Sequence, residues 1–351
     1  MRYFNKSLKF SSKHLNLNKY HIINIKIFKV LKLKGTWKLK LRMIFTSVIM
    51  FTLVYFIIMC IGWYFKIGFW QFYMFASLII VFLQYWYGPS IVKRSMNVRP
   101  LSEAEAPHIH QMLQELADEA GIKKPELGLS EINIPNAFAY GRSSRSGHIA
   151  ITRPILGLLD RDELKAVLGH EMGHIKHNDM IVTAAVSVIP MICYYLALSF
   201  LFSGDNDNGA GIIIGILGYV FYLIGQLLVL FISRTREYYA DAASVEFGNR
   251  PAALVSALYK LSYGAAGCSK ETIDEVNSNR AFFINDVNNA KHDVTDFKQI
   301  DFDGDGKISD EELKLLANKD VKISKTNGIM ELLSTHPDSL KRVKRLAEME
   351  N

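Results

Sequence analysis

Four uncharged apolar blocks dominate the pattern of hydrophobic and polar positions, at residues 43–65, 69–88, 180–202 and 211–232. Each block holds about twenty residues, the length at which a helix crosses the hydrocarbon core of a bilayer. Four buried core helices are the alternative interpretation, but a long uncharged run that recurs four times favours membrane spans. The pattern therefore predicts two transmembrane hairpins. For the second hairpin, partial embedding beside the soluble part of the chain remains an alternative.

Shorter amphipathic segments separate the two hairpins. Residues 100–125 are expected to form a helix, because apolar positions share one face. Three short strands follow, at residues 126–130, 137–140 and 148–151. Asp160, with Glu163 three residues later, has the pattern of a capping box and predicts the start of another helix. The expected fold class is mainly α (α+β), in a polytopic membrane protein with four transmembrane helices and a soluble part that carries a small β-sheet.

The helix expected after Asp160 contains the sequence His-Glu-Met-Gly-His at residues 170–174. Residues four apart lie on one face of a helix, so His170 and His174 can bind the same metal ion. Glu171 then lies next to the remaining coordination position, where a carboxylate can take a proton from water. This spacing predicts a zinc peptidase site. The alternative is a pair of core histidines on an ordinary helix.

A catalytic zinc usually has three protein ligands, so a third donor is needed. His177 lies on the same helix one turn further along, and it is expected to pack or to support a ligand. Glu237 is the stronger candidate, and Asp241 four residues later faces the same way. Asp241 can accept the free ring N–H of a ligand histidine and so fix its tautomer. A solvated acidic helix face is an equally good explanation of these two residues taken alone.

With these residues in view, the chain resembles HtpX-type zinc metalloproteases of the M48 peptidase class. The matching motifs occur in the family's order, at residues 85–87, 103–107, 135–139, 158–179, 237–241 and 334–337, followed by Arg342. The resemblance implies a zincin-like domain in which His170, His174 and Glu237 bind Zn²⁺. It also implies that Glu171 is the general base.

The same resemblance implies two further elements of the site. The small sheet would lie beside the metal-binding helix, and its edge strand would bind substrate as an added strand, with Asn136, Ala137 and Phe138 as the residues involved. His336 would approach the scissile carbonyl or the leaving group and stabilise the developing oxyanion. A loop histidine that caps a helix is the plain alternative for His336.

Charge is distributed unevenly along the chain. Residues 1–42 hold twelve of the 41 Lys and Arg residues and no Asp or Glu, so the rest has 29 basic and 34 acidic residues and a formal net charge of −5. No nucleic-acid-binding module is recognisable, and contact of the tail with anionic membrane lipid is the expected role. Basic residues flank both hairpins, which predicts a multi-pass protein of the cell membrane with a cytoplasmic catalytic domain. The scattered Cys60, Cys193 and Cys268 fit a reducing compartment.

The family pattern is interrupted between residues 283 and 329 by a sequence typical of an EF-hand loop. Its expected Ca²⁺ ligands are Asp301, Asp303, Asp305, the carbonyl of Lys307, Ser309 and Glu312. Gly306 permits the sharp turn, and residues 296–300 and 311–317 are the expected flanking helices. No second loop is apparent, which predicts weak binding because EF-hands normally pair. A solvated acidic turn is the alternative.

These segments divide the chain into seven parts: a basic tail (1–42), a first hairpin (43–90), a first catalytic part (91–178), a second hairpin (179–233), a second catalytic part (234–284), the EF-hand-like insert (285–326) and a C-terminal catalytic part (327–351). The expected function is zinc-dependent endoproteolysis of misfolded or surplus membrane proteins. One alternative is a CAAX-type prenyl-protein peptidase, which has more membrane spans. The other is a calcium-responsive membrane scaffold with structural zinc, which requires a fourth metal ligand.

Overall fold

The computed structural model describes residues 70–202, 210–276, 282–285, 289–317 and 334–350. Every described element lies within one compact unit, Ser47–Asn351. The basic tail and the apolar block at residues 43–65 therefore lie outside the described residues, as does the turn at 203–209.

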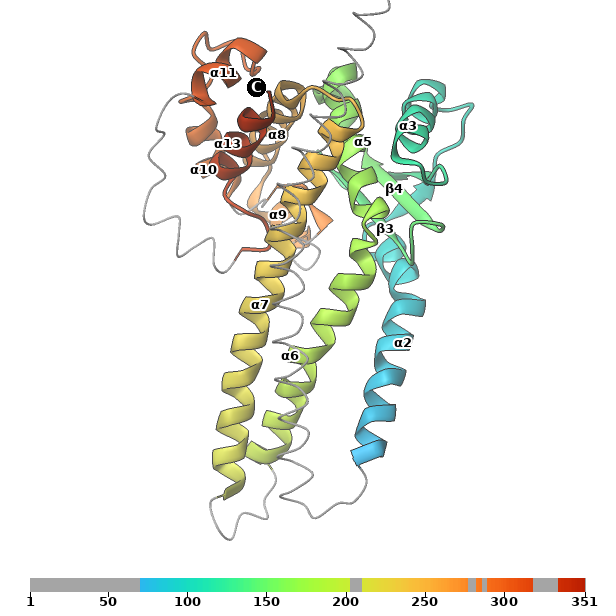
Figure 1. The fold of residues 1–351 in the computed structure, drawn as a ribbon, viewed down its shortest axis with the longest axis vertical. Helices are drawn as coiled ribbons and strands as arrows, with labels where there is room; N and C mark the ends of the chain where they lie inside the picture. The colour runs from blue at the N-terminus through green and yellow to red at the C-terminus, as the bar shows by residue number, and fades with distance from the viewer. Residues whose placement is uncertain (1–69, 203–209, 277–281, 286–288, 318–333, 351) are drawn as a thin grey trace, which may run out of the picture. The chain divides into compact units, whose positions relative to one another are not determined.

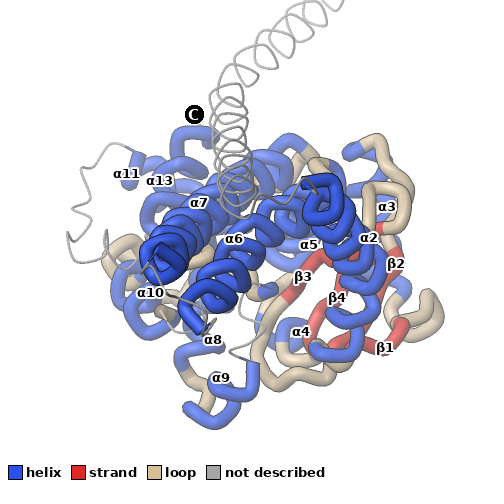
Figure 2. The backbone as a smooth tube through the Cα atoms, turned by 90° about the horizontal axis from the view of Figure 1, so that it is seen from below, coloured by secondary structure: helices blue, strands red, loops and turns tan. Residues whose placement is uncertain are grey.

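A four-stranded mixed sheet has the order β1-β2-β4-β3. Its strands are β1 (Val98–Pro100), β2 (Glu126–Ser130), β3 (Ala137–Gly141) and β4 (Gly147–Thr152). β2 pairs with β4 in parallel, and the other two pairs are antiparallel. The three strands expected from the sequence are confirmed, whereas the short β1 was not anticipated. β3 lies at one edge of this sheet, next to α5 (Figure 2).

Helices cover the sheet and form the rest of the core. The longer ones are α3 (Pro107–Ala120), α5 (Arg161–Lys176), α8 (Pro251–Ala266) and α13 (Ser339–Glu350). The shorter ones are α4 (Ile155–Leu158), α9 (Lys270–Val276), α10 (Ala290–Phe297) and α11 (Asp310–Ala317). α3 is shorter than the 100–125 range that was expected. Pro107 starts it at a position where proline is tolerated, and Gly121 ends it with a φ of 67°.

Three long helices extend from this domain: α2 (Trp70–Ser95), α6 (Asp179–Phe202) and α7 (Ala210–Glu246) (Figure 1). α6 and α7 pack side by side, and small residues let them approach closely. A Cβ on Gly218 would lie 3.3 Å from Ala197, and one on Gly225 would lie 3.2 Å from Pro190.

α7 corrects one expectation from the sequence. The apolar block at 211–232 was expected to belong to the second hairpin (179–233), and Glu237 to a separate catalytic part (234–284). They form one continuous helix from Ala210 to Glu246. Glu237 therefore lies on the same helix as the apolar block.

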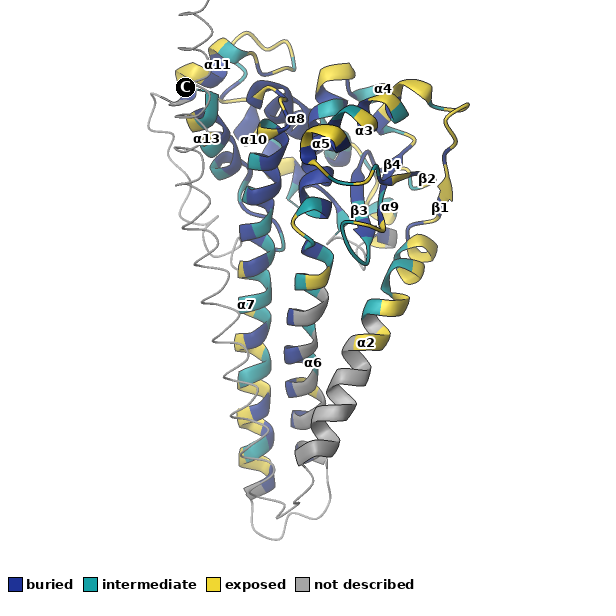
Figure 3. Cartoon of the chain, turned by 45° about the vertical axis from the view of Figure 1, so that its right-hand side comes forward, coloured by how far each residue is buried: buried dark blue, intermediate teal, exposed yellow. Residues whose placement is uncertain are grey.

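α7 is also the helix that bears on the membrane prediction. Among the described residues, one helix, Gly211–Glu246, is long and apolar enough to cross a membrane, and its most apolar 18-residue stretch has a mean hydropathy of 2.3. Its outward apolar side chains, such as Ile213, Ile216 and Leu217, are more than half exposed (Figure 3). One of the four expected spans is thus found in the described part of the chain.

Candidate active site

The helix that carries the His-Glu-Met-Gly-His sequence starts as the sequence predicts. The Asp160 carboxylate accepts hydrogen bonds from the main-chain N–H groups of Asp162 and Glu163, at 3.1 and 3.0 Å. The Glu163 carboxylate accepts in return from the N–H of Asp160 at 2.8 Å, which completes the capping box. Glu163 is buried and also accepts from Ser256 and Lys260 of α8. The cap therefore fixes the start of α5 against a second helix.

Two glycines let α5 approach α7 closely. A Cβ on Gly173, inside the pentapeptide, would lie 2.8 Å from the Cβ of Ala243 and 3.1 Å from the Cα of Ala240. A Cβ on Gly169 would lie 2.9 Å from the hydroxyl oxygen of Ser244 in α7. Real Cβ atoms do not tolerate such distances, so the glycines set the spacing of the two helices. That spacing brings the α5 histidines within reach of Glu237.

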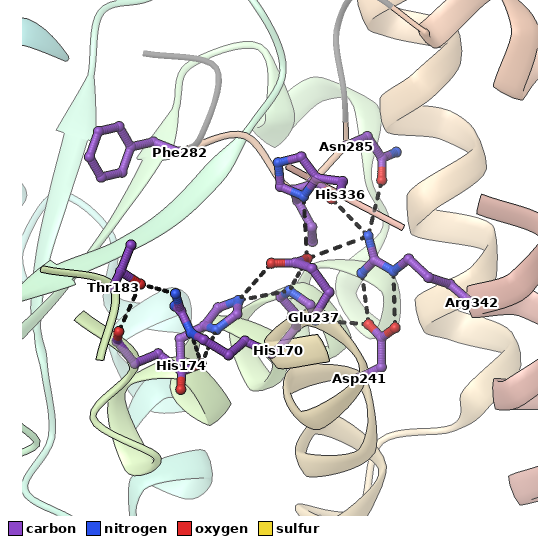
Figure 4. Close-up of polar contacts among 12 residues, drawn as sticks. His170, His174, Thr183, Glu237, Asp241, Phe282, Asn285, His336 and Arg342 are labelled. Carbon is purple, nitrogen blue, oxygen red and sulfur yellow. Dashed lines mark hydrogen bonds and ion pairs between the residues drawn. The ribbon is translucent and has the colours of Figure 1, made fainter. Parts of the chain in front are cut away.

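Three donors converge between these helices (Figure 4). The Nε2 atoms of His170 and His174 lie 3.2 Å apart. The Glu237 carboxylate lies 3.5 Å from the Nε2 atom of His170 and 3.6 Å from that of His174. One ligand atom from each residue lies within 4.8 Å of the other two. His170 is fully buried, and Glu237 is nearly so.

Two carboxylates behind the histidines fix which nitrogens face the shared point. His170 Nδ1 lies 2.9 Å from Asp241 Oδ1, and His174 Nδ1 lies 2.7 Å from Asp179 Oδ2. A carboxylate is only an acceptor, so each Nδ1 is the donor and each Nε2 presents a lone pair. Asp241 was expected in this position. Asp179, at the start of α6, was not.

The donor set fits a bound cation. Two imidazole lone pairs and a carboxylate point at one buried place, where they would repel one another unless a positive charge lay between them. Burial alone would lower the pKa of His170, but the carboxylates of Asp241 and Glu237 outweigh it and raise the pKa to about 9. This place therefore favours a positive charge, which a metal ion would supply in place of the proton on Nε2. Two nitrogens and one carboxylate oxygen in this arrangement are typical zinc ligands.

An arginine anchors each orienting carboxylate. Arg342 of α13 donates twice to Asp241, from Nη2 at 2.7 Å and from Nε at 2.9 Å, and it is buried. Arg236 of α7 forms an ion pair with Asp179 at 3.2 Å and donates a hydrogen bond to Thr183. The sequence motif contained Arg342 without indicating a role for it. The role of Arg236 depends on how α6 and α7 pack and left no local signal.

Glu171 lies beside the edge strand. Its carboxylate is buried and accepts a hydrogen bond from the main-chain N–H of Ala139 in β3. Burial raises the pKa of Glu171, which favours its use as a proton acceptor near neutral pH. In the ladder between β3 and β4, the Thr152 N–H donates to the Asn136 carbonyl. Hydrogen-bonded and non-bonded pairs alternate along an antiparallel ladder, so Phe138 bonds to β4. The main-chain groups of Ala137 and Ala139 then point away from β4, toward the open edge of the sheet.

His336 completes the wall of the site. It is buried, its Nδ1 atom lies 3.5 Å from Glu237 Oε2, and neither ring nitrogen has a hydrogen-bond partner among the described residues. A cavity of about 260 Å³ joins His336 to the metal-binding residues, Glu171 and β3. Its remaining lining is largely apolar and comes from α2, α6 and the segment at 282–284. An unpartnered buried imidazole in such a cavity is available to a bound substrate.

Two other candidates lie near the site in different settings. His177 ends α5, and its ring contacts Tyr239 edge to face at a centroid distance of 5.7 Å. Asn136 precedes β3, where its side chain donates to the carbonyl of Phe282 and accepts from the N–H of Ile284. Asn136 thus ties the strand to the segment that lines the cavity, while Ala137 and Phe138 line the cavity directly.

The EF-hand-like loop lies between α10 and α11. The carboxylates of Asp301, Asp303 and Asp305 lie within 4.8 Å of one another. Gly304 and Gly306 have φ angles of 74° and 79°, which other residues rarely adopt. Glu312 is not part of that group of oxygens. Its carboxylate accepts from the main-chain N–H of Phe302 and from the N–H and hydroxyl of Ser309.

This segment is joined to the catalytic domain. Ile308 is buried in the main core, and Phe297 stacks on Tyr259 of α8 at a centroid distance of 5.2 Å. The ammonium group of Lys307 donates to the Asp160 carboxylate at 3.0 Å. The loop therefore contacts the cap of the metal-binding helix, although the sequence suggested a separate insert.

A buried His–His–Glu donor set, a neighbouring glutamate and an adjacent edge strand define the active site of a metallopeptidase. The chain belongs to peptidase family M48, whose family model matches residues 103–350. A protein named protease HtpX homolog from Methanothermobacter thermautotrophicus is 54% identical over 227 residues, covering 65% of this chain and 87% of the relative.

More distant proteins also match. A protease HtpX homolog from Persephonella marina is 32% identical over 282 residues, covering 78% of this chain and 86% of its own. The crystal structure of S. mikatae Ste24p aligns with a TM-score of 0.43 at 17% identity, covering 88% of this chain and 66% of that structure.

Proposed function

We propose that this chain is a zinc-dependent endopeptidase of the cell membrane. The observation that carries the proposal is the convergence of His170, His174 and Glu237 beside Glu171. A zinc ion held there would polarise the scissile carbonyl and activate water. Glu171 takes a proton from the attacking water and passes it to the leaving amine. His336 donates a hydrogen bond to the oxyanion that develops on the carbonyl oxygen.

The substrate binds along β3 in this proposal. The outward main-chain groups of Ala137 and the outward carbonyl of Ala139 pair with an extended peptide, and Phe138 contributes to the apolar wall. The Asn136 side chain holds the segment at 282–284 in place and so shapes the cavity. A peptide placed on this edge lies next to Glu171, because the N–H of Ala139 already contacts that carboxylate.

The membrane setting is supported by α7 and by the apolar blocks. The residues from Ala210 to Glu237 span about 40 Å at 1.5 Å per residue, enough to cross the hydrocarbon core and leave Glu237 beyond it. We propose a multi-pass protein with the site on the cytoplasmic side, acting on misfolded or surplus membrane proteins. In a chain without native cysteines, a cysteine placed at Ala210 should react with an impermeant reagent in intact cells, and one at Ser144 should not.

Digestion of casein and of a membrane-protein substrate tests the activity itself. We expect cleavage by the purified zinc-loaded protein, loss of cleavage with a chelator, and recovery when zinc is added back. A prenyl-protein peptidase would instead cleave a prenylated peptide and leave casein intact. A scaffold with structural zinc would cleave neither and would need a fourth ligand, whereas the donor group among the described residues has three members.

We further propose that the loop at residues 301–312 binds Ca²⁺. The convergence of Asp301, Asp303 and Asp305 supports this proposal. To bind the ion, the Glu312 carboxylate would give up its hydrogen bonds to the main-chain N–H groups of Phe302 and Ser309. The Ser309 hydroxyl and the Lys307 carbonyl would complete the set of ligands. The burial of Ile308 in the catalytic core takes the place of pairing with a second loop.

A further inference from the structure

A second cavity, of about 180 Å³, adjoins the active-site cavity. It lies where the end of α2 meets the sheet, and basic side chains from three segments line it: Lys93, Arg99 and Arg142. Tyr140 and Pro89 line both cavities, so they form part of the wall between them. Whatever occupies the second cavity therefore lies next to strand β3.

Two of the three cations lack a carboxylate partner. Arg99 forms ion pairs with Glu105 and Glu131, at 2.9 and 3.4 Å. The one carboxylate in the lining, Glu126, lies 3.3 Å from the imidazole of His148. Across the described ranges, no Asp or Glu lies within ion-pair distance of Lys93 or Arg142. The lining therefore carries three cations and one carboxylate, and two of the cations form no ion pair with a described residue.

These two charges are directed to one place. The Arg142 Nε donates to the Trp86 carbonyl at 3.2 Å, and its guanidinium lies 4.6 Å from the centre of the Trp86 ring. That contact fixes the guanidinium against α2. Burial lowers the pKa of His148, the Glu126 carboxylate raises it, and the charges of Lys93 and Arg142 lower it. Both cations line the same cavity of about 180 Å³, which puts them within reach of one bound anion.

The cavity lies at the end of an apolar helix with exposed aromatic side chains. Phe82, Trp86 and Tyr87 of α2 are about half exposed, and the rings of Phe82 and Trp86 stack at 5.9 Å. Tryptophan and tyrosine are enriched at the boundary between hydrocarbon and headgroups. Lys93 follows Trp86 by seven residues of the same helix, a rise of about 10 Å, so it lies beyond these aromatic side chains toward the sheet.

We propose that this cavity binds the phosphate of an anionic lipid headgroup, with the Lys93 ammonium and the Arg142 guanidinium as its ligands. This proposal rests on the membrane setting proposed above. Zwitterionic lipids also carry a phosphate, but their own ammonium group would meet the same two cations. Anionic lipid is therefore favoured, and the bound headgroup lies against Tyr140 at the end of the substrate strand.

Native mass spectrometry of the full chain, purified in detergent with phosphatidylglycerol or phosphatidylcholine, tests the proposal. Wild type should retain phosphatidylglycerol in preference to phosphatidylcholine. At about 1 kcal/mol for each basic residue, the double variant Lys93→Gln, Arg142→Gln should bind it roughly thirtyfold more weakly. Lys123→Gln, Lys298→Gln removes two exposed charges elsewhere and should bind like wild type. Arg142→Lys, which keeps the charge, should recover most of the affinity.

Three results would overturn the lipid site. The first is equal retention of phosphatidylglycerol by wild type and by the Lys93→Gln, Arg142→Gln variant. The second is an equal loss of bound phosphatidylglycerol in that variant and in the Lys123→Gln, Lys298→Gln control. The third is displacement of the lipid by millimolar inorganic phosphate, which would indicate a small-anion site. Glu171→Gln should bind the lipid normally, and the lipid variant should cleave a soluble peptide normally. Failure of the lipid site is therefore distinguishable from failure of the proposed peptidase.

Discussion

Arg342 donates two hydrogen bonds to Asp241, at 2.7 and 2.9 Å, across 101 residues of sequence. Asp241 in turn contacts His170 Nδ1 at 2.9 Å. One carboxylate therefore links the last described helix to a metal-binding histidine. The same guanidinium donates to the Ile284 carbonyl at 2.8 Å, so it also positions the segment that lines the active-site cavity.

Replacing Arg342 with Lys should lower the affinity for zinc about ten- to hundredfold, because lysine keeps the charge but cannot hold Asp241 with two parallel bonds. Zinc competition with a chelating dye measures this, alongside thermal melting. Lys344→Gln, an exposed change on the same helix, is the control. Wild-type zinc affinity in Arg342→Lys would show that Asp241 does not need this partner.

Asp179→Asn should weaken zinc binding by a similar factor. The amide can offer its nitrogen as well as its oxygen to His174, so the tautomer that presents Nε2 to the metal is no longer enforced. Asp274→Asn, at an exposed position, should have no effect. The expected signature is a lower zinc affinity with an unchanged fold by circular dichroism, and unchanged affinity would rule out the orienting role.

The candidate metal ligands could be picked out from the sequence because their signals are local. His170, Glu171 and His174 occupy one helix at fixed spacing, and Asp241 follows Glu237 by one turn. Asp179 could not be assigned in this way, because its contact with His174 depends on the turn between α5 and α6. The contact of Arg236 with Asp179 depends on the packing of α6 against α7. Asn136 shows the same limit, because its side chain bonds to main-chain atoms 146 and 148 residues away.

Secondary structure could likewise be predicted where its signal is local. Alternating and capped segments gave β2, β3, β4 and the start of α5 correctly. The continuity of α7 through residue 233 was missed, since the change from apolar to charged residues resembles a boundary although helix propensity continues across it.

Gly173→Ala should destabilise the protein by about 1–3 kcal/mol, because its Cβ would lie 2.8 Å from that of Ala243 and push α5 away from α7. Zinc affinity should fall with stability, since Glu237 moves away with α7. Gly157→Ala is the control, because a Cβ there meets no atom within 4 Å. Thermal melting of the zinc-free and zinc-loaded forms separates the two effects. An unchanged melting temperature would contradict the close packing.

Calcium should bind the loop at residues 301–312 with one site per chain. Isothermal titration of the zinc-loaded protein should give binding heat in wild type and in Glu311→Gln, an exposed change at a position without a ligand role. Asp301→Ala should abolish that heat. Equal calcium heats in wild type and Asp301→Ala would leave the loop as an acidic surface turn.

The central claim is that Glu171 takes the proton from water while other residues hold the metal. Glutamine at this position keeps an oxygen that can accept from the Ala139 N–H, so the local geometry should persist. Zinc content and peptide cleavage should be measured together on purified Glu171→Gln. The account predicts near-stoichiometric zinc with cleavage reduced by at least about a hundredfold. Cleavage at the wild-type rate with zinc bound would contradict it.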